Sequence, residues 1–302
     1  MSRLSAHAWL LTKRVALDSA QDRVHGLAAE GAFFALLSLP PFLLAVLGTI
    51  GYFRDLLGPD TMDEIQGLML GVPAEFLSSD TMREFIRPSV DAILERGRGG
   101  VVSLGLVIAL WSGSRATGVY IDAIAIAYDL GDPRPLWQRR LLAFALTLVA
   151  AVIGVVVLPG LVVGPRLVKL VTPAPFETAV STAVTLVFWP MVALLAVLLL
   201  ATLYHVSLPQ RTPWQRDLPG AFLALGVWLL GSYGLRLYVE HSLLGQSPYG
   251  PLAAPLVVLL WLYVTAFAVL LGAELNGVIH QLWPPGAGLP ILAPPVDRSR
   301  DL

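Results

Sequence analysis

The sequence predicts an all-α polytopic membrane protein with six transmembrane helices. Hydrophobic residues make up 56% of the 302-residue chain and charged residues only 14%, and the mean hydropathy is +0.72. A soluble domain carries roughly 25% charged residues, so this chain lacks the polar groups that a globular surface needs. Crossing the hydrocarbon core takes about 20 mostly apolar residues. Six stretches meet that length: 27–53, 100–127, 141–164, 180–204, 218–239 and 252–280.

The distribution of Lys and Arg between the two sides predicts the orientation. With six spans, both termini lie on one side, and eleven Lys and Arg residues flank the spans there. The other side has seven, five of them in one long loop that also holds nine acidic residues. Basic residues favour the cytoplasmic side. We therefore expect both termini in the cytoplasm.

Three segments outside the spans complete the predicted organisation. Residues 1–25 form an amphipathic helix that either lies on the cytoplasmic membrane surface or packs against the bundle. Residues 26–283 form the transmembrane domain, which includes an extracytoplasmic amphipathic loop at 54–99. The tail at 284–302 is rich in Pro and is expected to be disordered.

Prolines inside two spans predict kinked or broken helices. Pro40 and Pro41 lie in the middle of the first span, and Pro190 interrupts the fourth. Proline removes a backbone donor and clashes with the preceding turn. Discontinuous helices line the substrate path in many transporters, although prolines also shape helix packing without any role in transport.

Polar residues inside the spans are the candidate functional residues, because ionisable groups are costly in the membrane. Ser112, Arg115 and Asp122 lie in the second span, and Arg115 and Asp122 share a face about 10 Å apart along the axis. Gly113 and Gly118 would let a neighbouring helix approach closely. The remaining candidates lie in the first and last spans: Glu30, Glu274 and Asn276. Together they predict either a hydrated vestibule open to the cytoplasm or a salt-bridged network that fixes helix packing.

Several kinds of chemistry have no signature in the sequence. There are no cysteines, no phosphate-binding loop and no histidine pair at zinc spacing. The net charge of -1 gives no attraction toward nucleic acid. We therefore expect no catalytic residues, no metal site, no cofactor and no nucleic-acid partner.

Four blocks, in order along nearly the whole chain, resemble the YihY/BrkB family of bacterial inner-membrane proteins. They are Ala28–Pro41, Trp111–Arg115 followed by Arg139 and Arg140, Leu218–Ala221, and Tyr249–Gly250 with Trp261–Tyr263 and Leu271–Asn276. Family members often have a tyrosine pair in place of Phe33 and Phe34, and a small apolar residue in place of Glu30. The resemblance therefore supports Arg115 and Glu274 more than it supports Glu30.

This resemblance implies a six-helix protein of the bacterial inner membrane. Some members carry a ribonuclease label, against which this sequence argues, because it has no metal-ligand cluster and no basic patch. The expected function is transport of phospholipid or another amphiphile without ATP, with Arg115 meeting the phosphate and with membrane lipids as partners. A small-ion or solute channel is one alternative. Another is a scaffold that binds an extracytoplasmic protein through residues 54–99; the sequence sets no oligomeric state.

Overall fold

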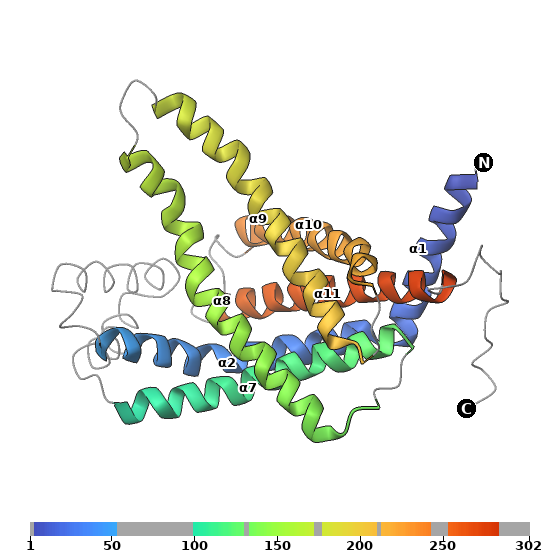
Figure 1. The fold of residues 1–302 in the computed structure, drawn as a ribbon, viewed down its shortest axis with the longest axis horizontal. Coiled ribbons are helices and arrows are strands. Elements are labelled where there is room, and N and C mark those ends of the chain that lie inside the picture. The colour runs from blue at the N-terminus through green and yellow to red at the C-terminus, as the bar shows by residue number, and fades with distance from the viewer. Residues whose placement is uncertain are drawn as a thin grey trace.

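The computed structural model describes residues 3–52, 99–129, 133–171, 177–209, 213–242 and 253–283, and these contain helices but no strand. The all-α prediction is confirmed. The predicted tail at 284–302, and the predicted loop at 54–99 apart from its last residue, lie outside the described residues. The helices are α1 (Arg3–Gln21), α2 (Val24–Tyr52), α7 (Gly99–Ala127), α8 (Leu136–Val171), α9 (Glu177–Ser207), the short 3-10 helix η3 (Trp214–Asp217), α10 (Leu218–Ser242) and α11 (Ala253–Leu282) (Figure 1).

Five of these helices are long and apolar enough to cross a membrane. The qualifying segments lie in α7, α8, α9 and α11 and in η3 together with α10, and they coincide with five of the six predicted spans. The first predicted span, 27–53, coincides with α2, in which the side chains beyond residue 42 lie outside the described part. The count of six spans and the cytoplasmic termini stay predictions.

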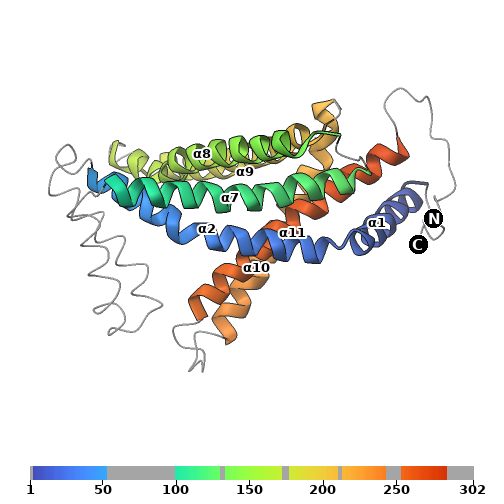
Figure 2. The same ribbon diagram turned by 90° about the horizontal axis from the view of Figure 1, so that it is seen from below.

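The six longest described helices form three antiparallel pairs, α2 with α7, α8 with α9, and α10 with α11. The pairs come together near the C-terminal ends of α7, α9 and α11. From there they diverge, so that α8 and α9 point away from α10 and α11 (Figure 2). Residues far apart in sequence therefore meet at one end of the molecule.

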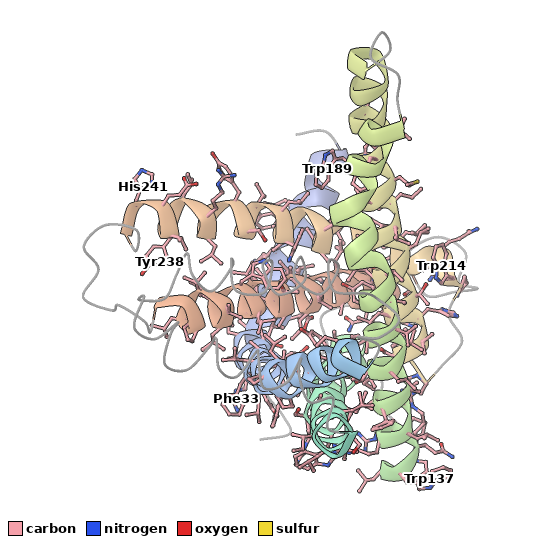
Figure 3. The ribbon with its side chains drawn as sticks, turned by 90° about the vertical axis from the view of Figure 1, so that its left-hand side faces the viewer. Phe33, Trp137, Trp189, Trp214, Tyr238 and His241 are labelled. Atoms are coloured by element: carbon pink, nitrogen blue, oxygen red, sulfur yellow. The ribbon has the colours of Figure 1, made fainter. Side chains whose placement is uncertain are left out.

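Small side chains are buried at the contact of three helices, while many large apolar side chains lie on the outside of the bundle. Ala28, Ala123 and Ala266 are buried where α2, α7 and α11 meet, which lets the backbones approach closely. Phe33 and Trp189 are exposed, and Figure 3 shows them on the outside of their helices. Association through small residues is the usual way in which membrane helices pack, because large apolar side chains are equally well accommodated by lipid.

Helix α1 packs on the bundle through one face. Its Val15 and Ser19 are buried, and α1 contacts α11 and α2. The opposite face exposes Trp9, Leu10 and Leu17. The helix predicted in residues 1–25 is thus present, and its position on the membrane surface stays a prediction.

The two helices predicted to be kinked or broken at their prolines are continuous. Helix α2 continues through Pro40 and Pro41, and α9 continues through Pro190. A proline removes one backbone hydrogen bond, but ending the helix in hydrocarbon would leave many more backbone groups without partners. The helices therefore continue, and α2 accommodates its prolines while changing direction along its length (Figure 2).

Candidate functional site

One face of α7 is exposed along nearly its whole length. We call this face the outer stripe of α7. It follows helical spacing and consists of the exposed residues Leu104, Ile108, Trp111, Arg115, Asp122 and Ile126, with the half-buried Gly118 between Arg115 and Asp122. Its apolar members suit contact with lipid. The stripe also carries two charged residues, and these are two of the six candidates from the sequence.

Arg115 lies at mid-helix on this stripe with its side chain exposed. It is twelve residues before Ala127, the last residue of α7, which corresponds to about 18 Å along the helix axis. Its guanidinium carbon is 5.7 Å from the ring centre of Phe34 on α2 and 5.6 Å from that of Trp111. Two aromatic rings thus stabilise the cation by cation–π contact, and Arg115 makes no ion pair with any described residue.

Asp122 lies two turns nearer the end of α7 and pairs with Arg139 of α8. The Arg139 Nη1 to Asp122 Oδ1 distance is 3.3 Å, and the Asp122 side chain is 55% exposed. An ion pair this open to solvent contributes little stability, about 0–1 kcal/mol. Both side chains therefore remain in contact with solvent while they pair.

The two glycines of α7 have different surroundings. A Cβ at Gly113 would lie 3.0 Å from Thr147 Cγ2 of α8, so this glycine does allow close helix approach, as predicted. A Cβ at Gly118 would have no atom within 4 Å among the described residues. The same prediction does not hold for Gly118 among the described residues, because no helix there approaches this half-buried glycine closely.

The other candidates lie elsewhere. Ser112 is buried, and its hydroxyl donates to the carbonyl of Ile108 at 2.8 Å, within its own helix. Glu30 is exposed on α2. Glu274 and Asn276 are buried on α11, where the helix pairs meet. The structure thus distributes the six candidates between the surface and the interior instead of gathering them around one vestibule.

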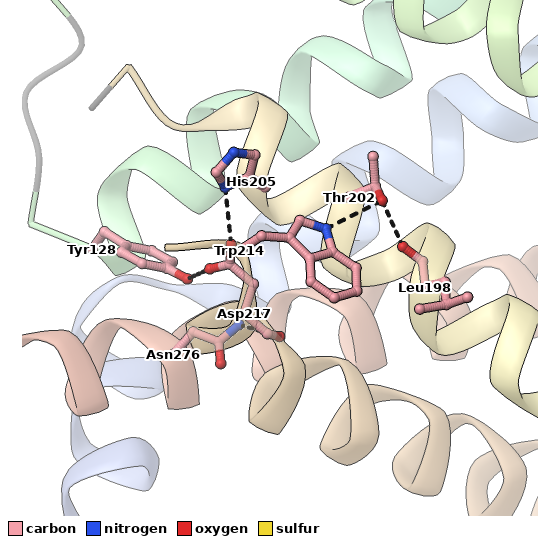
Figure 4. A network of polar contacts seen from close by, with 7 residues as sticks. All are labelled: Tyr128, Leu198, Thr202, His205, Trp214, Asp217 and Asn276. Atoms are coloured by element: carbon pink, nitrogen blue, oxygen red, sulfur yellow. Dashed lines mark hydrogen bonds and ion pairs between the residues drawn. The ribbon is translucent and has the colours of Figure 1, made fainter. Parts of the chain in front are cut away.

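A buried polar junction joins the C-terminal ends of α7, α9 and α11 to η3 and the start of α10. At its centre is Asp217, which is fully buried. The Tyr128 hydroxyl donates to Asp217 Oδ1 at 2.8 Å, and His205 Nδ1 lies 3.4 Å from Asp217 Oδ2 (Figure 4). Burial and then the negative charge of Asp217 raise the pKa of Tyr128, so the phenol keeps its proton and acts as the donor.

Asn276 completes this junction from α11. Its Nδ2 donates to the Asp217 carbonyl at 3.0 Å, and its Oδ1 accepts from the Gly220 backbone N–H at 2.7 Å. The first N–H groups of a helix have no partner within the helix. Asn276 therefore acts as a cap that a neighbouring helix supplies to α10.

Glycines permit the close contact on which this junction depends. A Cβ at Gly220 would collide with the Gly272 carbonyl and with Asn276, and a Cβ at Gly277 would collide with the Ala127 carbonyl. The sequence block Leu218–Ala221 contains one of these glycines. Its role is thus to bring the backbones of α10 and α11 together.

Sequence reasoning missed Asp217, Tyr128 and His205 as partners. One signal for Asp217 was available, because an Asp directly before a Leu-Pro helix start is a typical N-terminal pattern. Tyr128 lies 89 positions before Asp217 and His205 lies 12 positions before it. A hydropathy pattern does not indicate contacts between residues so far apart in the sequence. Among the described residues, no group of three or more His, Cys, Asp or Glu side chains is placed to hold a metal.

These features define an integral, multi-pass helical membrane protein. The chain belongs to the family described as Virulence factor BrkB, whose model matches residues 16–289. The resemblance drawn from the four sequence blocks is thus confirmed.

Three bacterial relatives match most of the chain. A protein of Bacillus subtilis named "Putative ribonuclease-like protein YfkH" is 26% identical over 90% of this chain and 94% of its own length. A protein named "UPF0761 membrane protein" from Pseudoalteromonas atlantica is 27% identical over 86% of this chain and 82% of its own. Another protein of that name, from Cronobacter sakazakii, is 26% identical over 89% of this chain and 87% of its own length. No solved structure matches the chain. The relatives and the helices together place the protein in a bacterial cell membrane.

Proposed function

We propose that this protein transports phospholipid, or another amphiphile with an anionic headgroup, across the membrane without hydrolysing ATP. The supporting observation is Arg115, an exposed arginine in the middle of an apolar helix that forms no ion pair with the described residues. An arginine at the centre of a membrane helix costs about 2.5–3.5 kcal/mol on insertion scales. A phosphate that accepts two hydrogen bonds from the guanidinium would offset that cost.

The direction in which Arg115 faces favours a lipid over a small ion. A pore requires polar groups that face one another between helices. Arg115 instead lies on the outer stripe of α7, beside the exposed Trp111 ring. A ligand that reaches this position from the bilayer keeps its acyl chains in lipid while its headgroup meets the arginine.

We propose further that the protein is not an enzyme. The printed name of the Bacillus subtilis relative refers to a ribonuclease, but metal-assisted phosphodiester chemistry uses clustered ligands. The net charge of the chain is -1, whereas RNA-binding proteins present a basic surface. Both arguments count against cleavage of RNA.

The test is movement of fluorescent phospholipid between leaflets of vesicles that contain the purified protein. We expect movement above that of empty vesicles, and at least about tenfold slower movement with Arg115→Gln, because a hydrogen bond to a charged group contributes about 1.5–3 kcal/mol. Arg236→Gln is the matched control, since Arg236 is also exposed in a membrane helix but already pairs with Glu240 at 2.7 Å.

Wild-type protein that leaves lipid movement at the level of empty vesicles would refute this proposal. An Arg115→Gln variant with the wild-type rate would remove the observation on which it rests. Ion currents through planar bilayers without lipid movement would favour the channel instead.

A further inference from the structure

We infer that a phosphate-bearing lipid headgroup moves along the outer stripe of α7 from the Asp122–Arg139 pair to Arg115, and that Gly118 leaves the space through which it passes. This inference rests on the proposed function and specifies its route. It assigns a role to Gly118 and to Arg139, neither of which was among the candidates from the sequence.

The positions along α7 define one continuous surface. Gly118 is three residues after Arg115, and Asp122 is seven residues after it. In an α-helix these offsets bring all three onto one face, with axial separations from Arg115 of about 4.5 Å and about 10.5 Å. The headgroup therefore meets a charged group at each end of the segment from Asp122 to Arg115, and both groups lie on the same helix.

Gly118 is the only position of the outer stripe without a side chain. Because a Cβ there would have no described atom within 4 Å, helix packing does not explain the glycine. A large side chain at this position would cover the surface between Arg115 and Asp122. Gly118 thus sets the space available to a headgroup in transit.

The Asp122–Arg139 pair forms the entrance. The Arg139 side chain is 32% exposed and that of Asp122 is 55% exposed, so an approaching headgroup can reach both. A phosphate matches the guanidinium fork as a carboxylate does, and it can replace Asp122 as the partner of Arg139. Once the phosphate moves on, Asp122 pairs with Arg139 again.

Arg115 and its rings form the inner end of this route. Phe34 and Trp111 both lie within 6 Å of the guanidinium and leave its hydrogen-bond donors available to a phosphate in the plane of the group. The ligand that fits is a lipid with a phosphate headgroup and acyl chains that remain in the bilayer, since the apolar members of the stripe are exposed.

The first experiment measures lipid movement in vesicles with Gly118→Leu. We expect transport to fall to the level of empty vesicles while folding is unchanged. Gly226→Leu is the control, because Gly226 also has no described atom within 4 Å of an added Cβ. It lies eight residues from the start of α10, and Gly118 lies nine from the end of α7, so the two have similar depth. Transport that survives Gly118→Leu, or that is lost equally with Gly226→Leu, would overturn the route and leave the proposed function standing.

The second experiment reports headgroup binding without transport, and it uses the absence of cysteine from the chain. Gly118→Cys in an uncharged detergent is labelled with an uncharged maleimide. We expect phosphatidylglycerol to slow the labelling, diacylglycerol with the same acyl chains to leave it unchanged, and Arg115→Gln to abolish the protection. Labelling of Gly226→Cys should respond to neither lipid.

The two measurements separate the two failures. Protection at Gly118→Cys in a protein that moves no lipid would refute transport and retain the headgroup site. Labelling that phosphatidylglycerol does not slow would refute the headgroup site, whatever the transport assay shows.

Discussion

Asn276 on α11 accepts a hydrogen bond from the backbone N–H of Gly220 on α10 at 2.7 Å, and the same side chain donates to the Asp217 carbonyl at 3.0 Å. A single buried amide thus satisfies one donor and one acceptor at the start of another helix. The stability of the protein should therefore depend strongly on this junction.

Replacing Asn276 with Ala should destabilise the protein strongly. Two buried backbone groups would lose their partners, and each such loss costs about 1–3 kcal/mol, so we expect about 2–6 kcal/mol in total. Unfolding in mixed micelles measures this difference. Gln281→Ala is the control, because Gln281 is exposed on the same helix. Equal effects of the two substitutions would contradict the capping role of Asn276.

Two glycine-to-alanine substitutions should have effects of opposite sign. At Gly277 the added methyl group collides with the Ala127 carbonyl of α7, so α7 and α11 must separate and the melting temperature should fall. At Gly226 there is open space, and alanine favours the helix by up to about 1 kcal/mol. Thermal unfolding in detergent tests both. A stabilising Gly277→Ala would show that the close contact of α7 and α11 is not required.

Loss of the Tyr128 hydroxyl should destabilise the protein, because Asp217 would lose a hydrogen-bond donor. Tyr128→Phe removes the donor to a fully buried carboxylate, and hydrogen bonds to charged groups contribute about 1.5–3 kcal/mol. Tyr238→Phe, at an exposed position of α10, should change stability far less. In a double-mutant cycle, Tyr128→Phe should cost less in an Asp217→Asn background, because the amide oxygen is a neutral and weaker acceptor; additive effects would separate the two residues energetically.

Asp122→Asn should leave stability nearly unchanged but alter transport. The ion pair with Arg139 is exposed, so its loss costs no more than about 1 kcal/mol. The side chain at position 122 would then no longer compete with a phosphate for the Arg139 guanidinium. We expect faster movement of anionic phospholipid relative to zwitterionic phospholipid. A slower rate for the anionic lipid would show that Asp122 assists the headgroup directly.

Single cysteines can test the predicted topology, because the chain has none of its own. We expect cysteines placed in residues 1–25 to react with an impermeant thiol reagent only after the membrane is opened, and those in 54–99 to react in intact spheroplasts. Labelling of both segments from the same side would refute either the count of six spans or the orientation.

The sequence predicted the helices far better than their faces. Hydropathy locates α7 and α11 within a few residues, because a long apolar stretch in a bilayer forms a transmembrane helix. It does not say which face turns outward, since both faces of such a helix are apolar. Gly118 was therefore expected at a helix contact, but it is half-buried and has no close neighbour among the described residues.

The buried junction was beyond sequence reasoning for a different reason. Asp217 follows a connecting segment and reads as an ordinary loop charge, yet it is fully buried because α7, α9 and α11 surround it. Asn276, in contrast, was identified as a costly polar group inside a span. A polar residue can thus be flagged by its position within one helix, but its partners become known only from the packing of several.

The convergence of the three helix pairs at this junction has a mechanical consequence. A 30-residue helix such as α11 is about 45 Å long. Fixed at one end, it behaves as a lever, and a rotation of about 5° at the fixed end displaces the other by about 4 Å. Small adjustments among Asp217, Asn276 and Tyr128 are thereby amplified on the opposite side of the molecule, while the hydrogen bonds at the pivot stay intact.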